Sequence, residues 1–138
     1  MTPQQIGLVQ HSFAQVAPQA EEVAALFYAR LFEIDPSTQP LFAGDMKEQG
    51  RKLMQMIGVV VRGLGRLEQL VPAIQDLGRR HVGYGVTDTH YDTVGAALLW
   101  TLEQGLKDDF SPDVKNAWAT AYGLLADTMK TAAEAQAA

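Results

Sequence analysis

Three residues that can cap a helix are each followed at once by proline. The pairs are Thr2-Pro3, Asp35-Pro36 and Ser111-Pro112. A capping oxygen accepts a hydrogen bond from a free backbone N–H of the first turn, and proline suits the first helical position because it lacks that N–H. Apolar residues recur at helical spacing after these starts, and no segment alternates polar and apolar residues as a half-buried strand would. The sequence therefore predicts an all-α fold of about six to eight helices.

The predicted helices divide the chain without a linker or an internal repeat. We expect a very short helix after Pro36, and longer helices that begin at Pro3, Gln19, Met46, Pro72, Asp88 and Pro112. On the helix from Met46, one predicted buried stripe contains Met46, Gln49, Leu53, Met56, Ile57 and Val60. A chain of 138 residues is long enough to bury one sizeable core. Residues 1–138 are therefore expected to form a single domain.

Charge and cysteine usage exclude several classes of function. The formal net charge of −5 argues against a nucleic-acid or anionic-membrane surface, which clustered Lys and Arg would favour. The chain has no Cys, so disulfides, thiolate metal sites and covalent thioether attachment of a cofactor are excluded. No apolar run approaches the roughly 20 residues of a membrane span, and the N-terminus lacks the features of a signal peptide. We expect a cytoplasmic protein that holds any cofactor non-covalently.

His81 lies on the apolar face of the helix predicted from Pro72. Ile74, Leu77 and His81 recur at i, i+3 and i+7, and Gly83 ends the helix soon afterwards. A histidine in such a place is ordinarily a buried, hydrogen-bonded core residue, and its alternative role is that of a ligand. Taken by itself, the segment favours the interpretation of His81 as a core residue.

Other polar side chains also stand among apolar neighbours. The Tyr28 hydroxyl must bond a backbone carbonyl or point towards another proton acceptor. Gln49 must reach the edge of the helix, bond another side chain or face a ligand. His90 is either a half-buried residue or a second ligand candidate, whereas His11 lies on a polar face. Phe42, at the edge of a turn, is either a plug over the core or part of a pocket.

The order of these features along nearly the whole chain resembles the globin family. The matching residues are Phe27-Tyr28, Pro36, Leu41-Phe42, Gln49 to Leu53, Leu77, His81, Val86, Tyr91 and Trp118. The chain is similar to bacterial single-domain haemoglobins, to the globin domain of flavohaemoglobins and to neuroglobin-like bacterial globins. The resemblance implies a globin fold packed around haem b.

The resemblance also implies a role for each site residue. His81 would bind the haem iron, Phe42 would wedge the porphyrin, and Tyr28 and Gln49 would donate hydrogen bonds to a bound ligand. Leu53 would act as the steric gate on that side. The remaining positions that would contact the cofactor are Leu77, Val86, Tyr91 and Val94, with Arg80 as a counter-charge for a propionate. Arg79, Arg51 and Lys52 are further candidates for that counter-charge.

One position departs from the flavohaemoglobin pattern. In those globins the tyrosine matched by Tyr91 joins a glutamate of the last helix in hydrogen-bonding the proximal histidine, here His81. Counting from Trp118 places that glutamate at Ala133, while Glu134 lies about 100° further round the helix. Without this acceptor the imidazole is less anionic and pushes less electron density onto iron. The departure puts peroxidase-like or fast dioxygenase chemistry in doubt.

Several functions follow from the resemblance. The first is reversible, high-affinity binding of oxygen or a related small ligand such as nitric oxide, carbon monoxide or sulfide. The second is a nitric oxide dioxygenase, which would need an external reductase as partner because we find no flavin or nicotinamide domain in the sequence. The third is a gas or redox sensor, or a haem-free helical interaction domain. The oligomeric state stays open.

Overall fold

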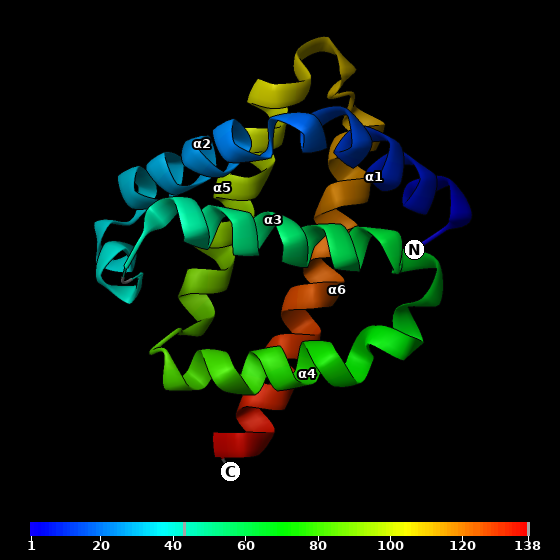
Figure 1. Cartoon of the computed structure of the whole chain (residues 1–138). Helices are drawn as coiled ribbons and strands as arrows, with labels where there is room; N and C mark the ends of the chain where they lie inside the picture. Colours follow the sequence, from blue (N-terminus) through cyan, green and yellow to red (C-terminus); the bar gives the residue numbers. More distant parts are fainter. Residues whose placement is uncertain (43, 138) are drawn as a thin grey trace.

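The computed structural model of the chain describes residues 1–42 and 44–137, without the side chains of residues 136 and 137 (Figure 1). Within these residues there is no strand, so the predicted all-α fold is confirmed. The α-helices are α1 (Pro3–Val16), α2 (Ala20–Ile34), α3 (Met46–Arg62), α4 (Leu67–Gly83), α5 (Asp88–Leu106) and α6 (Pro112–Ala137). Short 3-10 helices are η1 (Ala17–Gln19), η2 (Pro36–Leu41), η3 (Leu64–Arg66) and η4 (Lys107–Asp109). None of the helices in the described part combines the length and apolar character needed to cross a membrane.

The capping residues act as the sequence predicts. The Gln5 N–H donates to Thr2 Oγ1 at 3.1 Å, and the Gln5 side chain accepts from the Thr2 N–H at 3.0 Å. Asp35 accepts from the Ser37 N–H at 3.0 Å at the start of η2. Ser111 Oγ accepts from the Val114 N–H at 3.2 Å at the start of α6. Local hydrogen bonds therefore fix where these helices begin.

The start of the helix that carries His81 was predicted wrongly. α4 begins at Leu67 directly after η3, and Pro72 lies inside it rather than at its first position. A proline there forgoes one backbone hydrogen bond and favours a break in an isolated helix. The long contact of α4 with α6 outweighs this local preference. The predicted end is confirmed, because Gly85 adopts a positive φ of 84° just beyond α4.

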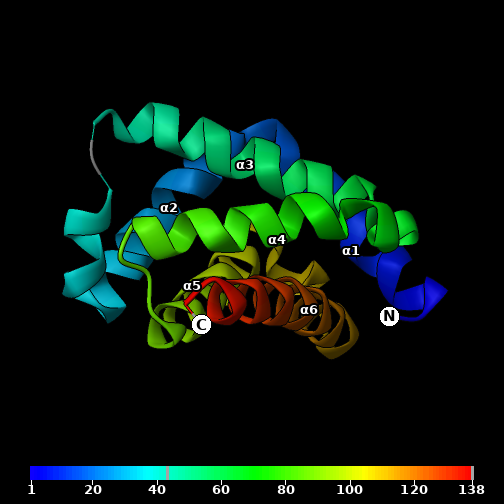
Figure 2. The same ribbon diagram turned by 90° about the horizontal axis from the view of Figure 1, so that it is seen from below.

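Helix packing places α3 and α4 in front of α5 and α6 (Figure 1). α3 packs mainly on α2, and α4 packs mainly on α6. The view from below shows the same layering, with α3 and α4 extending over α5 and α6 (Figure 2). The two helices that carry Gln49 and His81 are therefore each supported by a different helix.

Two close helix crossings depend on glycine. A Cβ at Gly50 of α3 would lie 2.9 Å from the Cβ of Ala24 on α2. A Cβ at Gly78 of α4 would overlap the backbone of Met129 on α6, 2.7 Å from its Cα. Real Cβ atoms do not approach other atoms so closely, so both contacts need a residue without a side chain.

Glycine also explains an error in the predicted stripe of α3. Met56 is 39% exposed, although the stripe placed it in the core. The fully buried side of α3 instead contains Gly50, Met54, Gly58, Val60 and Val61. A pattern that counts large apolar residues does not register a buried face built partly from glycine.

A polar bond inside the core joins the two ends of the fold. Trp118 Nε1 on α6 donates to Ser12 Oγ on α1 at 2.7 Å, and both side chains are buried. The Ser12 hydroxyl in turn donates to the Leu8 carbonyl at 2.7 Å. The indole N–H is thus satisfied without water, and α1 is fixed against α6.

Candidate functional site

Tyr28 is the centre of an aromatic cluster on α2. Its side chain is 7% exposed, and its ring lies 5.1 Å from the Phe42 ring in an edge-on arrangement. Leu53 of α3 and Val94 of α5 pack against the same cluster. The structure thus brings together four of the predicted site residues from three helices and a turn. Phe32, whose ring stacks 6.0 Å from Tyr28, belongs to this cluster although the sequence did not single it out as a site residue.

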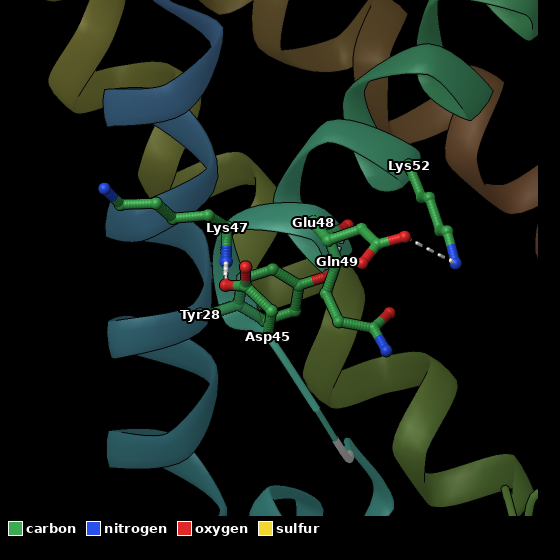
Figure 3. Close-up of polar contacts among 6 residues, drawn as sticks. All are labelled: Tyr28, Asp45, Lys47, Glu48, Gln49 and Lys52. Atoms are coloured by element: carbon green, nitrogen blue, oxygen red, sulfur yellow. Dashed lines mark hydrogen bonds and ion pairs between the residues drawn. The ribbon is translucent and has the colours of Figure 1, made fainter.

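The Tyr28 hydroxyl donates to the backbone carbonyl of Gln49 at 3.3 Å (Figure 3). The sequence left two kinds of partner open for this hydroxyl, a backbone carbonyl or another proton acceptor. In the structure the partner is a backbone carbonyl. The bond is long for an O–H donor, whose usual distance is about 2.7–2.8 Å. Burial raises the pKa of the Tyr28 hydroxyl to about 12. Tyr28 therefore keeps its proton at neutral pH and can donate a hydrogen bond to a bound acceptor.

Gln49 lies in the first turn of α3, where the helix cap sets its position. Asp45 accepts a hydrogen bond from the Lys47 N–H at 2.9 Å (Figure 3). The Gln49 side chain is half-buried and extends away from the Tyr28 ring (Figure 3). Leu53 lies one turn further along the same side of the helix. Gln49 and Leu53 are thus held on one rigid element beside Tyr28.

His81 lies near the end of α4 with one ring nitrogen already bonded. Its Nδ1 is 2.7 Å from the Leu77 carbonyl, which can only accept, so Nδ1 carries the proton. The tautomer leaves Nε2 with a free lone pair. Burial of the half-exposed ring lowers the pKa of His81, the Leu77 bond opposes that shift, and the Arg80 charge adds to it. The favoured form is the neutral imidazole, which is the form that binds a metal.

A second cluster lies beside His81. Leu77, Val86 and Tyr91 pack with Tyr122 of α6. The Tyr91 ring stacks 6.5 Å from the His81 ring, and Tyr122 donates its hydroxyl proton to the Tyr91 carbonyl at 2.5 Å. The hydrogen bond holds the first turn of α5 against α6, beside the histidine. Tyr122 was not predicted as a site residue, because its only signal is that it adjoins the buried stripe of α6.

The predicted departure at the proximal side has a structural counterpart. The His81 N–H goes to a neutral carbonyl, while Glu134 is exposed on α6. A cation also stands nearby, since Lys130 Nζ lies 5.6 Å from the centre of the Tyr91 ring. Neither feature makes the imidazole more anionic. The sequence offered no signal for Lys130.

The basic candidates for a propionate lie on the surface, and three of the four already have acidic neighbours. Arg80 Nη2 is 3.3 Å from Asp76 Oδ2, with 56% of the Arg80 side chain exposed. Arg51 is 3.9 Å from Glu21, and Lys52 is 3.6 Å from Glu48. Exposed pairs of this kind contribute about 0–1 kcal/mol, so any of these cations can exchange its partner.

The other two histidines have different surroundings. The Thr87 N–H donates to His90 Nδ1 at 3.0 Å, so His90 completes the start of α5 as a capping residue. His11 is exposed on α1, as the sequence predicts. His81 is therefore the histidine that combines partial burial, an oriented ring and an apolar setting.

The residues present fit a flat apolar group with a metal at its centre. Five large apolar side chains near Tyr28 and His81 are only half-buried, which leaves part of their surface free for a ligand: Phe42, Leu53, Leu77, Val86 and Val94. They come from both clusters. His81 Nε2 provides a neutral nitrogen ligand, and Tyr28 provides a protonated donor in a separate cluster.

Known proteins agree with this description. The Globin family model matches residues 25–129. A globin-like protein of Aquifex aeolicus is 38% identical over 110 residues, which cover 80% of this chain and 78% of the relative. An anaerobic nitrite reductase of Casuarina glauca is 30% identical over 144 residues, which cover 94% and 90%. A flavohemoprotein of Xylella fastidiosa is 30% identical over 132 residues, but only 33% of its own length is covered.

A solved structure shows the same architecture. The structure of a bacterial globin from Campylobacter jejuni matches with a TM-score of 0.84 and 25% identity, and 98% of each chain is covered. The class that the fold defines is thus that of all-α proteins with this helical architecture. The chain belongs to the globin family. Membership implies a haem cofactor and a small-molecule ligand.

Burial of Tyr28 has a consequence for stability at high pH. The unfolded chain loses this proton near the ordinary value of 10.0, whereas the folded chain keeps it to about pH 12. The folded state then binds more protons, so the free energy of unfolding is expected to fall between pH 10 and pH 12. In Tyr28→Phe the fall should be shallower, which urea unfolding at intervals of pH can measure. Equal slopes in the two proteins would contradict this expectation.

Proposed function

We propose that this globin binds haem b through His81 and reversibly holds oxygen, or a related small ligand, with high affinity. The observation that carries the proposal is the His81 ring, whose Nδ1 is bonded to the Leu77 carbonyl at 2.7 Å and whose Nε2 is free. Haem, when bound, would supply an iron centre that takes a small ligand, and His81 would hold that iron. We also propose that residues 1–138 act as one domain.

Each further site residue has a proposed part. Phe42, Leu77, Val86, Tyr91 and Val94 would contact the cofactor, and Arg80 would exchange Asp76 for a propionate. Leu53 would restrict the space available to the ligand. Tyr28 and Gln49 would donate hydrogen bonds to it. The half-burial of the apolar residues and the protonated state of Tyr28 support these assignments.

The Tyr28 proton is expected to slow ligand escape. Tyr28 would donate a hydrogen bond to a ligand that carries negative charge, and a phenol donor in a dry pocket would stabilise that charge by about 1.5–3 kcal/mol. The long bond to the Gln49 carbonyl, at 3.3 Å, is a weak competitor for the same proton. Tyr28 can therefore turn to the ligand at little cost.

Tyr28→Phe is expected to raise the oxygen dissociation rate by about 10- to 100-fold, since about 1.4 kcal/mol corresponds to a factor of ten. Stopped-flow mixing of the oxygenated protein with carbon monoxide measures this rate. Tyr84→Phe is the matched control, because Tyr84 is 57% exposed and lies outside the aromatic cluster. An unchanged rate in Tyr28→Phe would remove Tyr28 from the ligand site.

Nitric oxide dioxygenation by way of an external reductase is the second candidate. The flavohemoprotein relatives support it, as does the pairing of Tyr28 with Gln49. The neutral acceptor on His81 weighs against a high rate. Consumption of nitric oxide by the oxygenated protein over many cycles, with oxygen, a purified flavin reductase and its reduced nicotinamide cofactor supplied, would establish the enzyme. A single turnover, after which the iron is not reduced again, would leave reversible ligand binding as the proposed function.

The haem itself has a direct test. The purified protein should show a strong Soret band, and extraction into alkaline pyridine should give the spectrum of haem b. A colourless protein that takes up no added haemin would instead indicate a helical interaction domain.

A further inference from the structure

A cleft of about 260 Å³ lies at the corner where α3 gives way to α4. Its lining comes from the end of α3, from η3 and from the first turn of α4: Val59, Arg62, Gly63, Arg66, Gln69 and Leu70. None of these residues is among the predicted haem contacts. The proposed function leaves this cleft without a role.

The corner is built so that two arginines share the cleft. Gly63 ends α3, and its carbonyl accepts from the Arg66 N–H at 2.8 Å, which tightens the turn. A side chain at Gly63 would overlap Leu70, with its Cβ only 3.1 Å from the Leu70 Cγ. Leu70 can therefore close directly onto the end of α3. The tight corner places Arg62 and Arg66 on the same opening.

The positive charge of the cleft is not neutralised by the protein. Among the described residues neither Arg62 nor Arg66 has a carboxylate oxygen within 4.0 Å, whereas Arg30, Arg51, Lys52 and Arg80 each have one. The Arg62 guanidinium also folds back along its own helix, 3.2 Å from the Cβ position of Gly58. Both arginines of the lining thus lack a neighbouring acid among the described residues, on a chain of net charge −5.

The chemistry of the lining indicates the class of ligand. Arginine presents paired N–H donors that match the oxygens of a carboxylate or phosphate, and Gln69 adds an amide. Val59, which is 47% exposed, and Leu70 provide an apolar wall beside these donors. The volume lies below the range of about 300–1,000 Å³ that holds drug-sized ligands. We propose that this cleft binds a small organic oxyanion, a phosphate monoester or carboxylate with a short hydrocarbon chain.

Titration calorimetry of the full-length protein as purified tests this site with three probes: monobutyl phosphate, pentanoate and inorganic phosphate. At least one organic anion is expected to bind saturably with one site per chain. It should bind at least about fourfold more tightly than inorganic phosphate, which is the contribution of one buried methylene group. Comparison of the two organic probes identifies the favoured head group. Equal affinity for inorganic phosphate would overturn the organic part of the proposal.

Charge removal locates the site. Arg62→Gln and Arg66→Gln are each expected to weaken binding about tenfold or more, because each removes charge-assisted hydrogen bonds. Lys115→Gln removes one positive charge from the first turn of α6, where Lys115 is exposed, and should leave the affinity within about twofold. Unchanged binding by the double variant R62Q/R66Q, or an equal loss in Lys115→Gln, would overturn the proposal. Matching melting temperatures for all variants exclude unfolding as the cause.

Discussion

His81→Ala is expected to weaken haem affinity by more than about 100-fold. Loss of a residue that only supports a metal ligand costs about 10- to 100-fold, so loss of the ligand itself should exceed that range. The free lone pair on His81 Nε2 follows from the Nδ1 bond to Leu77, and alanine offers no replacement. Haemin titration of the haem-free protein, followed by the Soret band, measures the change. Added imidazole should restore part of the ligation, because alanine leaves room for a free ring.

His90→Ala and His11→Ala are the matched controls for this prediction. His90 caps α5 through the Thr87 N–H, so its loss is expected to cost about 1 kcal/mol of stability and leave haem ligation intact. His11 is exposed, and its replacement should change neither quantity. Survival of the normal spectrum in His81→Ala, together with its loss in His90→Ala, would show that the wrong histidine had been chosen.

Gly78→Ala is expected to lower the free energy of unfolding by about 3 kcal/mol. The new Cβ would overlap the Met129 backbone, which cannot move aside as a flexible side chain can. α4 must then move away from α6, and His81, one turn further along α4, moves with it. Haem affinity should therefore fall together with stability, as chemical denaturation and haemin titration would show.

Gly123→Ala is the control for this crossing. Gly123 lies in α6, and a Cβ there would meet nothing within 4 Å. Alanine is favoured over glycine in a helix, so this variant should gain about 0.5–1 kcal/mol. Equal stability of Gly78→Ala and Gly123→Ala would contradict the close crossing of α4 and α6.

The features that sequence could predict are the ones that depend on near neighbours. The caps at Thr2 and Asp35 involve residues two or three positions apart, so their hydrogen bonds follow from local chemistry. The placement of His81 on an apolar face is likewise local, and spacing alone identifies it. The ring of Tyr28 was predicted among apolar neighbours, and the structure surrounds it with aromatic rings.

The features that sequence missed depend on contacts made by the backbone. α4 begins before Pro72 because packing against α6 stabilises the helix there. No residue near Pro72 in the sequence indicates that contact. Gly50 is buried because Ala24 approaches it closely, yet glycine carries no apolar signal of its own. The Leu77 carbonyl that orients His81 and the Gln49 carbonyl that holds Tyr28 are main-chain groups. Side-chain patterns cannot specify which carbonyl a ring will reach.

The bond between Ser12 and Trp118 spans 106 positions in the chain. During synthesis α1 is made well before the Trp118 indole of α6, whose buried N–H needs the Ser12 hydroxyl as its acceptor. α4 also waits for α6, which provides its main packing surface. Such long-range contacts must close a large loop before they stabilise anything. The nascent chain should consequently be unable to position His81 until α6 has left the ribosome, so that haem capture follows the release of α6.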